Sequence, residues 1–509
     1  MPIRIGEPLS LEDVVAVARG AAAELAPSAL AGIRAARDRV ERAVADGETV
    51  YGVTTGFGSL ANVAIDPADA AELQHAIVRS HATAVGPFLS REEARAMLLL
   101  RAHGLAFGRS GVRLEVIERM LAFLARDLVP AVPQQGSLGA SGDLAPLACL
   151  ALPLIGGGAF LGTDGAARPA GAVLTAEGLA PLRLEAKEGL SLVNGTEGML
   201  AVGIPALLRL AQLVRTADVV AAMTIEGALG SDRPFDARLH ALRPHPGQIA
   251  SAANLRALLA GSPIVASHRD SPHLLQDAYS LRCAPQVHGA TRDALAYARR
   301  ILEIEVDAVA DNPVVFAEDG DVVSGGNFHG QPVATALDAL GIATVPLASV
   351  SERRLYRLLD PATGNGLPPF LVRDAGRNSG LMLVQYTAAS LVSESKVLAH
   401  PASVDSIPSS AGQEDHVSMG MTSARTFRDI VGNAEVVVAL EALAAAQAID
   451  LRAPLAAGAA TGAARDAIRA RVPHLDADRE LGPDIAATVD LVRSGALVSA
   501  AEAAVGPIA

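Results

Sequence analysis

Residues 136–148 read GSLGASGDLAPLA, a glycine-rich loop that leads directly into an apolar segment. Three glycines within 136–142 exclude a regular helix over the loop. The spacing GxxGxxG differs from the GxGxxG of dinucleotide-binding loops, and Asp143 stands where a phosphate-binding loop ends in Gly-Lys-Ser/Thr. A nucleophile elbow, GxSxG, around Ser141 would need its last glycine at position 143. Here that glycine comes one position early, and Asp143 stands in its place. A flexible turn without chemistry is the alternative interpretation of this loop.

The tripeptide Ala140-Ser141-Gly142 is suited to forming a ring. Gly142 offers an unhindered backbone nitrogen that can reach the carbonyl of Ala140 in a tight turn, because small residues permit strained conformations. Ring closure releases one water, and the hydroxyl of Ser141 leaves as a second. The product is a methylidene-imidazolone, a strong electrophile. No ordinary side chain is electrophilic, so an enzyme that needs an electrophile borrows a cofactor or makes one.

Composition predicts an all-α protein. Half of the 509 residues are hydrophobic, yet tryptophan is absent and aromatic residues make up 3%, so Ala, Leu and Val must build the core. Such a core favours closely packed helices over sheets. Helical periodicity predicts helices near 69–84, 91–108, 112–126, 287–310, 333–358, 378–399 and 424–449, with short strands and turns at 155–185. We expect an N-terminal domain over 1–200 and a helical-bundle domain over 201–509.

Charge and composition also bear on partners and compartment. The net charge is −13 and no basic run is interleaved with aromatic residues, so we expect no nucleic-acid partner. Cys149 and Cys283 lie in apolar contexts and are expected to be buried free thiols. No HExxH or clustered ligand spacing predicts a metal site. The first residues carry no long apolar stretch, which favours a cytoplasmic protein.

One uncharged segment, 144–162, is nearly long enough to span a membrane. Pro146, Pro153 and the glycines at 156–158 interrupt it, and no basic flank anchors it. We therefore expect a buried core segment that ends in a turn, and no membrane association.

The stretch 136–148 closely resembles the electrophile-forming segment of the aromatic amino acid ammonia-lyases and aminomutases. The resemblance implies a methylidene-imidazolone formed autocatalytically from Ala140-Ser141-Gly142, with no external cofactor. It also implies an all-α fold with a long central helical bundle of the aspartase/fumarase-like type, preceded by a mostly helical domain with glycine-rich active-site loops. A homotetramer whose active sites draw residues from several subunits is part of the same expectation.

Two further motifs extend the resemblance. Residues 51–58, YGVTTGFG, are similar to the family's loop with the catalytic tyrosine. Removing a proton from the substrate's β-carbon needs a strong base, and the phenolate of Tyr51 serves if its pKa lies below about 10. The alternative for Tyr51 is a packed aromatic ring. In 192–196, LVNGT, Asn194 is implied to hydrogen-bond near the electrophile or the substrate's carboxylate.

Residues 279–286, YSLRCAPQ, resemble the family's carboxylate-binding run. There Arg282 would hold the α-carboxylate bidentately, while Tyr279 and Gln276 would lie beside the electrophile and the substrate. A lone arginine is otherwise a surface charge. Residues 324–330, SGGNFHG, look like the loop that places Phe328 over the substrate or electrophile, and Asp311-Asn-Pro313 matches the motif before it. His329 also has a purely structural interpretation.

The substrate prediction depends on 400–408, HPASVDSIP, and 413–419, QEDHVSM, which resemble the histidine ammonia-lyase version of the family. Glu414 in an apolar pocket needs a partner, and an imidazole that becomes positive is such a partner. His81 would line the ring pocket, although a Ser-His pair also occurs in some tyrosine-acting members. The resemblance implies elimination of ammonia from L-histidine to give trans-urocanate.

Alternatives stay open at this point. Thr54, Gln331 and Gly412 depart from the usual histidine ammonia-lyase pattern, and the first two also look like tyrosine aminomutases. A tyrosine or phenylalanine ammonia-lyase, or a 2,3-aminomutase, would use the same electrophile. Attack on that electrophile by the amino group or by the aromatic ring is likewise undecided. The other classes are a non-catalytic helical assembly and a serine hydrolase at Ser141.

Overall fold

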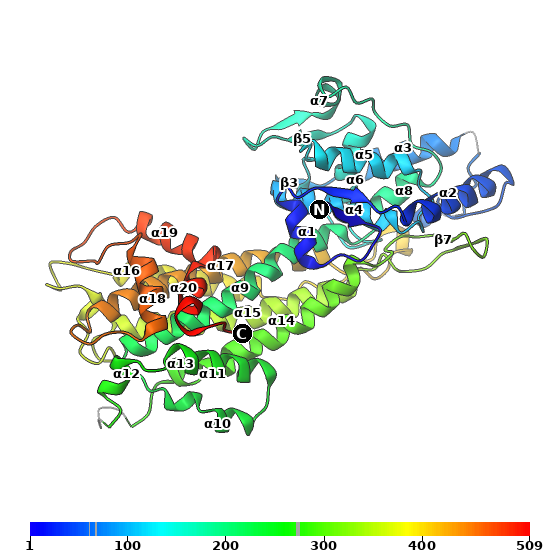
Figure 1. Ribbon diagram of the computed structural model, residues 1–509. Helices are drawn as coiled ribbons and strands as arrows, with labels where there is room; N and C mark the ends of the chain where they lie inside the picture. Colours follow the sequence, from blue (N-terminus) through cyan, green and yellow to red (C-terminus); the bar gives the residue numbers. More distant parts are fainter. Residues whose placement is uncertain (61, 67–68, 271–274) are drawn as a thin grey trace. The chain divides into compact units, whose positions relative to one another are not determined.

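The computed structural model describes residues 1–60, 62–66, 69–270 and 275–509 and forms two compact units (Figure 1). Unit 1 contains residues 1–205, 298–338 and 401–425, and unit 2 contains 206–297, 339–400 and 426–509. The first boundary falls five residues after the expected division at 200/201. Unit 1 also takes in two later segments that a division into consecutive pieces assigns to the second domain.

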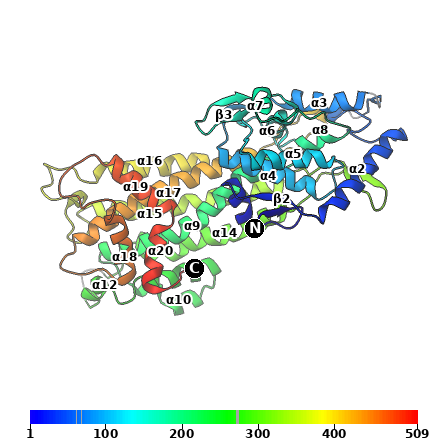
Figure 2. The same ribbon diagram turned by 45° about the horizontal axis from the view of Figure 1, so that its top comes forward.

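The described residues of unit 1 form short and medium helices and four two-stranded sheets. In Figure 2 the helices α4, α5 and α6 lie close to one another, and α3 packs with α6 and α8. The helices are α1 Leu11–Ala18, α2 Ala29–Ala45, α3 Ala70–His81, α4 Arg91–Ala106, α5 Leu114–Ala125, α6 Leu144–Ala151, α7 Ala170–Ala176 and α8 Glu188–Val193. The strands are β1 Ile3–Ile5, β2 Ala23–Leu25, β3 Val85–Phe88, β4 Pro133–Gln135, β5 Ala159–Leu161, β6 Ala167–Pro169, β7 Val314–Phe316 and β8 Asp321–Val323.

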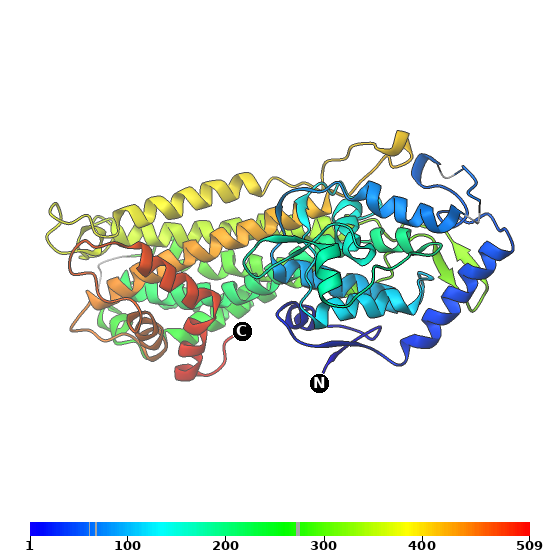
Figure 3. The same ribbon diagram turned by 90° about the horizontal axis from the view of Figure 1, so that it is seen from above.

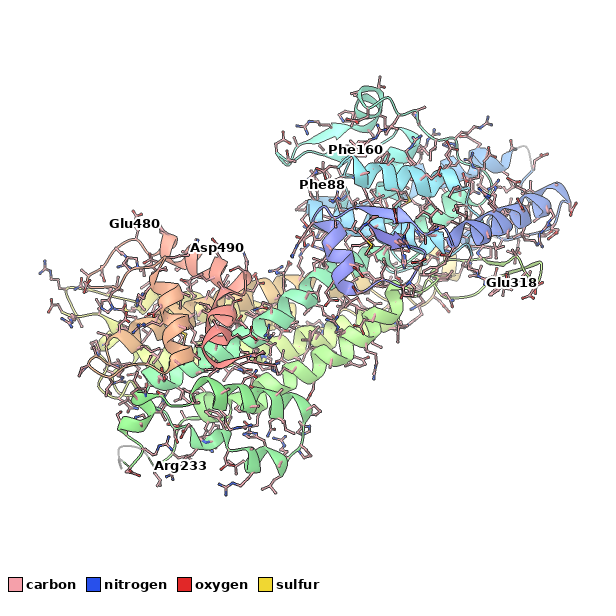
Figure 4. All side chains as sticks on the ribbon, in the orientation of Figure 1. Phe88, Phe160, Arg233, Glu318, Glu480 and Asp490 are labelled. Carbon is pink, nitrogen blue, oxygen red and sulfur yellow. The ribbon has the colours of Figure 1, made fainter. Side chains whose placement is uncertain are left out.

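Local sequence explains how these elements begin. Ser10 and Asp13 form a complete capping box at the start of α1, and Ser90 and Glu93 form another at α4. β1 and β2 pair in parallel, whereas β3–β4, β5–β6 and β7–β8 are antiparallel. Phe160 on β5 meets Phe123 of α5 edge-on at 5.0 Å, which fixes that hairpin on the helices (Figure 4).

Unit 2 is a bundle of long helices with shorter ones around it. The boundary between the units falls within α9 Glu197–Gly227, α14 Ala284–Val306, α15 Gln331–Leu359 and α17 Gly420–Asp450. In unit 2 these helices run side by side (Figure 3). The other helices of unit 2 are α10 Ala237–Ala241, α11 Pro246–Leu258, α12 Pro263–Ser267, α13 Tyr279–Arg282, α16 Met382–Leu398, α18 Ala459–Arg469, α19 Gly482–Arg493 and α20 Ala496–Val505.

One buried carboxylate, that of Glu441 on α17, joins three helices of this bundle. It accepts hydrogen bonds from Thr224 of α9 at 2.7 Å and from Ser351 of α15 at 2.6 Å, and it pairs with Arg354 of α15. The buried carboxylate of Glu441 therefore has partners on two other helices, as a buried charged group requires.

The core confirms the prediction of an all-α fold rich in Ala, Leu and Val. Ala444, Ala445, Ala446 and Ala448 on α17 have no exposed surface, which lets neighbouring helices approach closely. The uncharged segment at 144–162 begins as the buried helix α6 and reaches a left-handed turn at Gly156, as expected. Within the described residues, α9 and α15 are long and apolar enough to cross a membrane, but most of each apolar stretch is buried against the rest of the protein.

Candidate active site

The loop at 136–143 is a tight turn. Gly139 and Gly142 form an antiparallel bridge, so Ala140 and Ser141 occupy the tip, where Ser141 has a φ of 50°. Gly142 has a φ of 79° and also bridges to Gly195, and a Cβ added there would lie 2.0 Å from the Gly195 carbonyl oxygen. Only glycine fits this place. The turn, the small residues and the tight seating of Gly142 fit the ring-forming role expected for this tripeptide.

Asp143, directly after the loop, fixes it to the start of α9. Its carboxylate accepts hydrogen bonds from the Ser137 hydroxyl and from the backbone N–H of Met199, each at 2.7 Å. The N–H of Met199 is one of the amide groups that have no partner inside the helix at its N-terminus. Burial raises the pKa of Asp143 to about 6, although these hydrogen bonds oppose the shift.

The tip of the loop opens into adjoining cavities, all lined by unit 1. The first, of about 460 Å³, brings together the side chains of five predicted site residues: Tyr51, His81, Ser141, Asn194 and Glu414. The second, of about 490 Å³, shares Tyr51, Ser141 and Glu414 and adds Ala140, Phe328 and His329. A third, of about 280 Å³, contains Gly142 together with His81 and Glu414.

Tyr51 is held by its own loop. Its hydroxyl oxygen accepts the backbone N–H of Gly58 at 3.0 Å, a contact that fixes the position of the hydroxyl. Thr54 stabilises the start of the loop, since its hydroxyl accepts the N–H of Val50 at 2.8 Å and donates to the Glu48 carbonyl at 2.6 Å. The threonine that departs from the usual pattern therefore has a local structural role.

Asn194 ends α8 and is anchored by the Asp311-Asn-Pro313 motif and, through it, by Lys187, which no sequence motif marks. Its amide nitrogen donates to the carboxylate of Asp311 at 3.3 Å and to the Asn312 carbonyl at 3.1 Å. Asp311 in turn pairs with Lys187 at 3.0 Å, and neither side chain of the pair has exposed surface. Burial raises the pKa of Asp311, but Lys187 and Arg101 outweigh it, so the net pKa is lowered. Lys187 is one of only two lysines in the chain, a signal that was available in the sequence.

His81 and Glu414 form the polar side of the first cavity. Burial lowers the pKa of His81, and the nearby carboxylate of Glu414 opposes this shift. The Nδ1 atom of His81 lies 3.0 Å from the Ser80 hydroxyl. Glu414 accepts a hydrogen bond from Ser409 at 3.0 Å, which orients its carboxylate. The pair presents a carboxylate and an imidazole to one pocket.

The second cavity is bordered by the 324–330 loop. The backbone N–H of Gly325 donates to Asn312 at 2.8 Å, which ties this loop to the segment that anchors Asn194. His329 stacks on His416 with ring planes 7° apart and contacts its carbonyl at 3.1 Å. These contacts are consistent with the structural interpretation of His329, while Phe328 borders the cavity itself.

Three predicted site residues belong to unit 2 and do not line these cavities: Gln276, Tyr279 and Arg282. Tyr279 is 72% exposed, and the guanidinium of Arg282 lies 4.6 Å from the centre of its ring. The Nε of Arg282 donates to the Asp277 carbonyl at 2.9 Å. Among the described residues that line the three cavities there is no arginine or lysine. No cluster of metal-ligand side chains was found in the described part of the chain either.

Comparison with known proteins places this all-α chain in a known class. The family model for aromatic amino acid lyases matches residues 9–470. The chain belongs to the aromatic amino acid lyase family.

Particular relatives narrow this further. Histidine ammonia-lyase from Anaeromyxobacter sp. (strain K) is 56% identical over 500 residues, covering 97% of this chain and 98% of that protein. The crystal structure of histidine ammonia-lyase from Trypanosoma cruzi superimposes with a TM-score of 0.92 at 42% identity, covering 99% of this chain and 96% of that one. Tyrosine aminomutase from Streptomyces globisporus gives a TM-score of 0.94 at 39% identity and full coverage of both chains.

Proposed function

We propose that this chain is a carbon–nitrogen lyase that eliminates ammonia from L-histidine to give trans-urocanate. The observation that carries the proposal is the 460 Å³ cavity, which brings Tyr51, Ser141 and Asn194 together with the His81–Glu414 pair. The identity of 56% to a histidine ammonia-lyase over 97% of the chain supports the same function.

The proposal includes a methylidene-imidazolone made from Ala140, Ser141 and Gly142. When formed, this group supplies an electrophile that turns the substrate's nitrogen into a better leaving group. Tyr51, held by the N–H of Gly58, removes the β-proton. The electrons of the broken C–H bond form the Cα–Cβ double bond as the C–N bond breaks, and nitrogen leaves with its pair. Glu414 and His81 bind the imidazole ring.

We further propose that the working enzyme is a homotetramer with shared active sites. The substrate's carboxylate needs a cation, and no arginine or lysine is found among the described residues that line the cavities. Arg282 of unit 2, with Tyr279 and Gln276 nearby in sequence, is the proposed source. Such a site is completed when chains assemble.

A second candidate is a 2,3-aminomutase that acts on tyrosine. It is favoured by the TM-score of 0.94 to a tyrosine aminomutase. It is also favoured by Thr54 and Gln331, at which two motifs resemble those of tyrosine aminomutases. In that reaction the ammonia adds back to the β-carbon, so a β-amino acid is produced instead of free ammonia.

The experiment is product analysis of the purified protein with L-histidine, L-tyrosine and L-phenylalanine in separate incubations. We expect ammonia and urocanate from histidine and no β-amino acid from any of the three. Intact mass should show the loss of two waters at 140–142, and Ser141→Ala should remove both that loss and nearly all activity. Full activity of Ser141→Ala without the ring would overturn the proposal, and a β-amino acid product would favour the second candidate.

A further inference from the structure

A fully buried ion pair lies behind the candidate active site, in unit 1. Lys187 precedes α8 with a φ of 71°, and its Nζ donates to Asp311 Oδ2 at 3.0 Å and to the Ser191 hydroxyl at 2.9 Å. Neither side chain of the pair has exposed surface. Desolvation makes buried ion pairs poor contributors to stability, so this pair calls for a role other than holding the fold together.

The other oxygen of Asp311 reaches the site. Asp311 Oδ1 accepts the Nδ2 of Asn194 at 3.3 Å and the backbone N–H of Asn312 at 2.7 Å. The same Nδ2 donates to the Asn312 carbonyl at 3.1 Å. Both partners are acceptors, so the NH₂ end of the carboxamide must face them, and a flipped Asn194 would set oxygen against oxygen.

This fixes what Asn194 can offer to a bound molecule. Its Oδ1 has no hydrogen-bond partner among the described residues, and Asn194 borders the 460 Å³ cavity. Its backbone carbonyl is already engaged by Arg101 at 2.9 Å. An amide oxygen only accepts hydrogen bonds, as does an ionised carboxylate. An amino group, in contrast, donates.

We propose that Lys187 and Asp311 are positioning residues that lock the Asn194 carboxamide, so that its Oδ1 binds the substrate's amino group and not its carboxylate. The inference rests on the proposed lyase function and names one contact within it. Asp311 needs its charge to hold the NH₂ end, and Lys187 keeps that charge in a fully buried site. The locked oxygen then faces the nitrogen that leaves.

The test compares two ligands that differ in the amino group. The product trans-urocanate keeps the imidazole and the carboxylate but lacks the amine, and its binding is measured as product inhibition. In Lys187→Met, Asp311 loses its counter-charge and the carboxamide is released. We expect kcat/KM for L-histidine to fall roughly 10- to 100-fold, the worth of one hydrogen bond to a charged group, while the inhibition constant of urocanate changes less than about twofold.

Two more variants separate positioning from damage to the fold. Arg95→Met removes another buried cation of unit 1, one that bonds the carbonyls of Val17, Ala18 and Leu124 and makes no contact with this network. It should lower the melting temperature without changing kcat/KM. Ser191→Ala removes a hydroxyl that bonds both Lys187, at 2.9 Å, and Asp311, at 3.0 Å. It should reproduce the selective loss at smaller size, which keeps the test valid if Lys187→Met does not fold.

Two results would overturn the inference. An equal weakening of histidine turnover and urocanate binding would place the carboxylate, not the amine, on Asn194. An unchanged kcat/KM in both Lys187→Met and Ser191→Ala would show that the pair positions nothing. If wild type makes no urocanate, the proposed substrate fails, and the comparison is repeated with the amino acid that is turned over and its deaminated product.

Discussion

Glu414 is the one carboxylate among the described residues that line the 460 Å³ cavity, and it borders both neighbouring cavities as well. Besides its hydrogen bond from Ser409, this carboxylate can accept one from a bound molecule that brings an N–H or a positive charge. We predict that Glu414→Gln lowers kcat/KM for L-histidine by roughly 10- to 100-fold, since a charge-assisted hydrogen bond becomes a neutral one.

The matched control is Asp405→Asn, which removes an exposed charge of the same segment that lines none of the three cavities. It should leave kcat/KM for L-histidine within about twofold of wild type, because exposed charges contribute little. An equal effect of the two changes in steady-state kinetics would show that net charge, and not a contact with the imidazole, explains the loss.

The buried carboxyl group of Asp143 should make the stability of the fold depend on pH. Burial raises its pKa from 3.8 to about 6, so the folded protein binds more protons than the unfolded chain between these values. The contribution to stability is complete below pH 3.8 and is lost as the pH rises through about 6. About two pKa units at 1.36 kcal/mol each give ~3 kcal/mol. Relative to Asp143→Asn, the wild-type free energy of unfolding should fall by this amount across the window in urea titrations. Parallel curves for the two proteins would contradict the assignment.

The sequence predicted which side chains line the site, but not the buried contacts that hold them in place. Tyr51, His81, Ser141, Asn194 and Glu414 come from motifs, and they do line one cavity. Lys187 escaped notice because its partner, Asp311, lies 124 positions away, and nothing local marks a lysine as buried. The roles of these side chains in the reaction stay predictions.

Among the elements, the loop at 136–143 depends on glycine for two separate reasons. Gly142 and Gly165 both have a φ of 79°, but only Gly142 has a neighbour within 4 Å of an added Cβ. Gly165→Ala should therefore cost about 1–2 kcal/mol from backbone strain alone. Gly142→Ala should cost about 3 kcal/mol or more, because the new methyl meets the Gly195 backbone.

Denaturant unfolding measures both costs, and intact mass reports whether the ring has formed. We expect no ring in Gly142→Ala and a normal one in Gly165→Ala. Equal destabilisation by the two changes would mean that the bridge to Gly195 does not hold the loop.

Periodicity predicted the long helices well because each must bury one apolar face. The range 333–358 became α15 at Gln331–Leu359, and 424–449 became α17 at Gly420–Asp450. The glycine-rich loops could not be predicted in the same way. Their shapes depend on distant partners, such as the hydrogen bond from the Ser59 backbone to Ser410 at 3.1 Å.

For the whole molecule, the shared-site proposal predicts complementation between inactive variants. Ser141→Ala disables the loop of unit 1, and Arg282→Ala removes the proposed carboxylate ligand of unit 2. When the two chains are unfolded and refolded together, mixed tetramers should regain part of the ammonia release, because some sites then combine intact parts.

The control mixture is Ser141→Ala with Tyr51→Phe, two changes in one cavity of unit 1. A chain with either change has a defective cavity, so no combination restores a site. Activity in this control, or its absence in the first mixture, would contradict shared sites with this division of parts.

The arrangement of units follows contacts that chain order does not reveal. The segments 298–338 and 401–425 return to unit 1, where they contribute Phe328 and Glu414 to the cavities. A division into consecutive pieces at 200/201 could not anticipate this, since pairing over hundreds of residues leaves no local pattern in composition or periodicity.

Because lysine is scarce, the folded chain offers few sites to labels that react with amines. The sequence has lysine at 187 and 396 only, and Lys396 is exposed while Lys187 is fully buried. A dye or a surface linker that reacts with lysine amines would therefore attach at Lys396. Lys187 would take up label only when the interior behind the Asn194 carboxamide opens. Peptide mapping that compares the rate of labelling at Lys187 with the rate at Lys396 thus measures how often that interior opens.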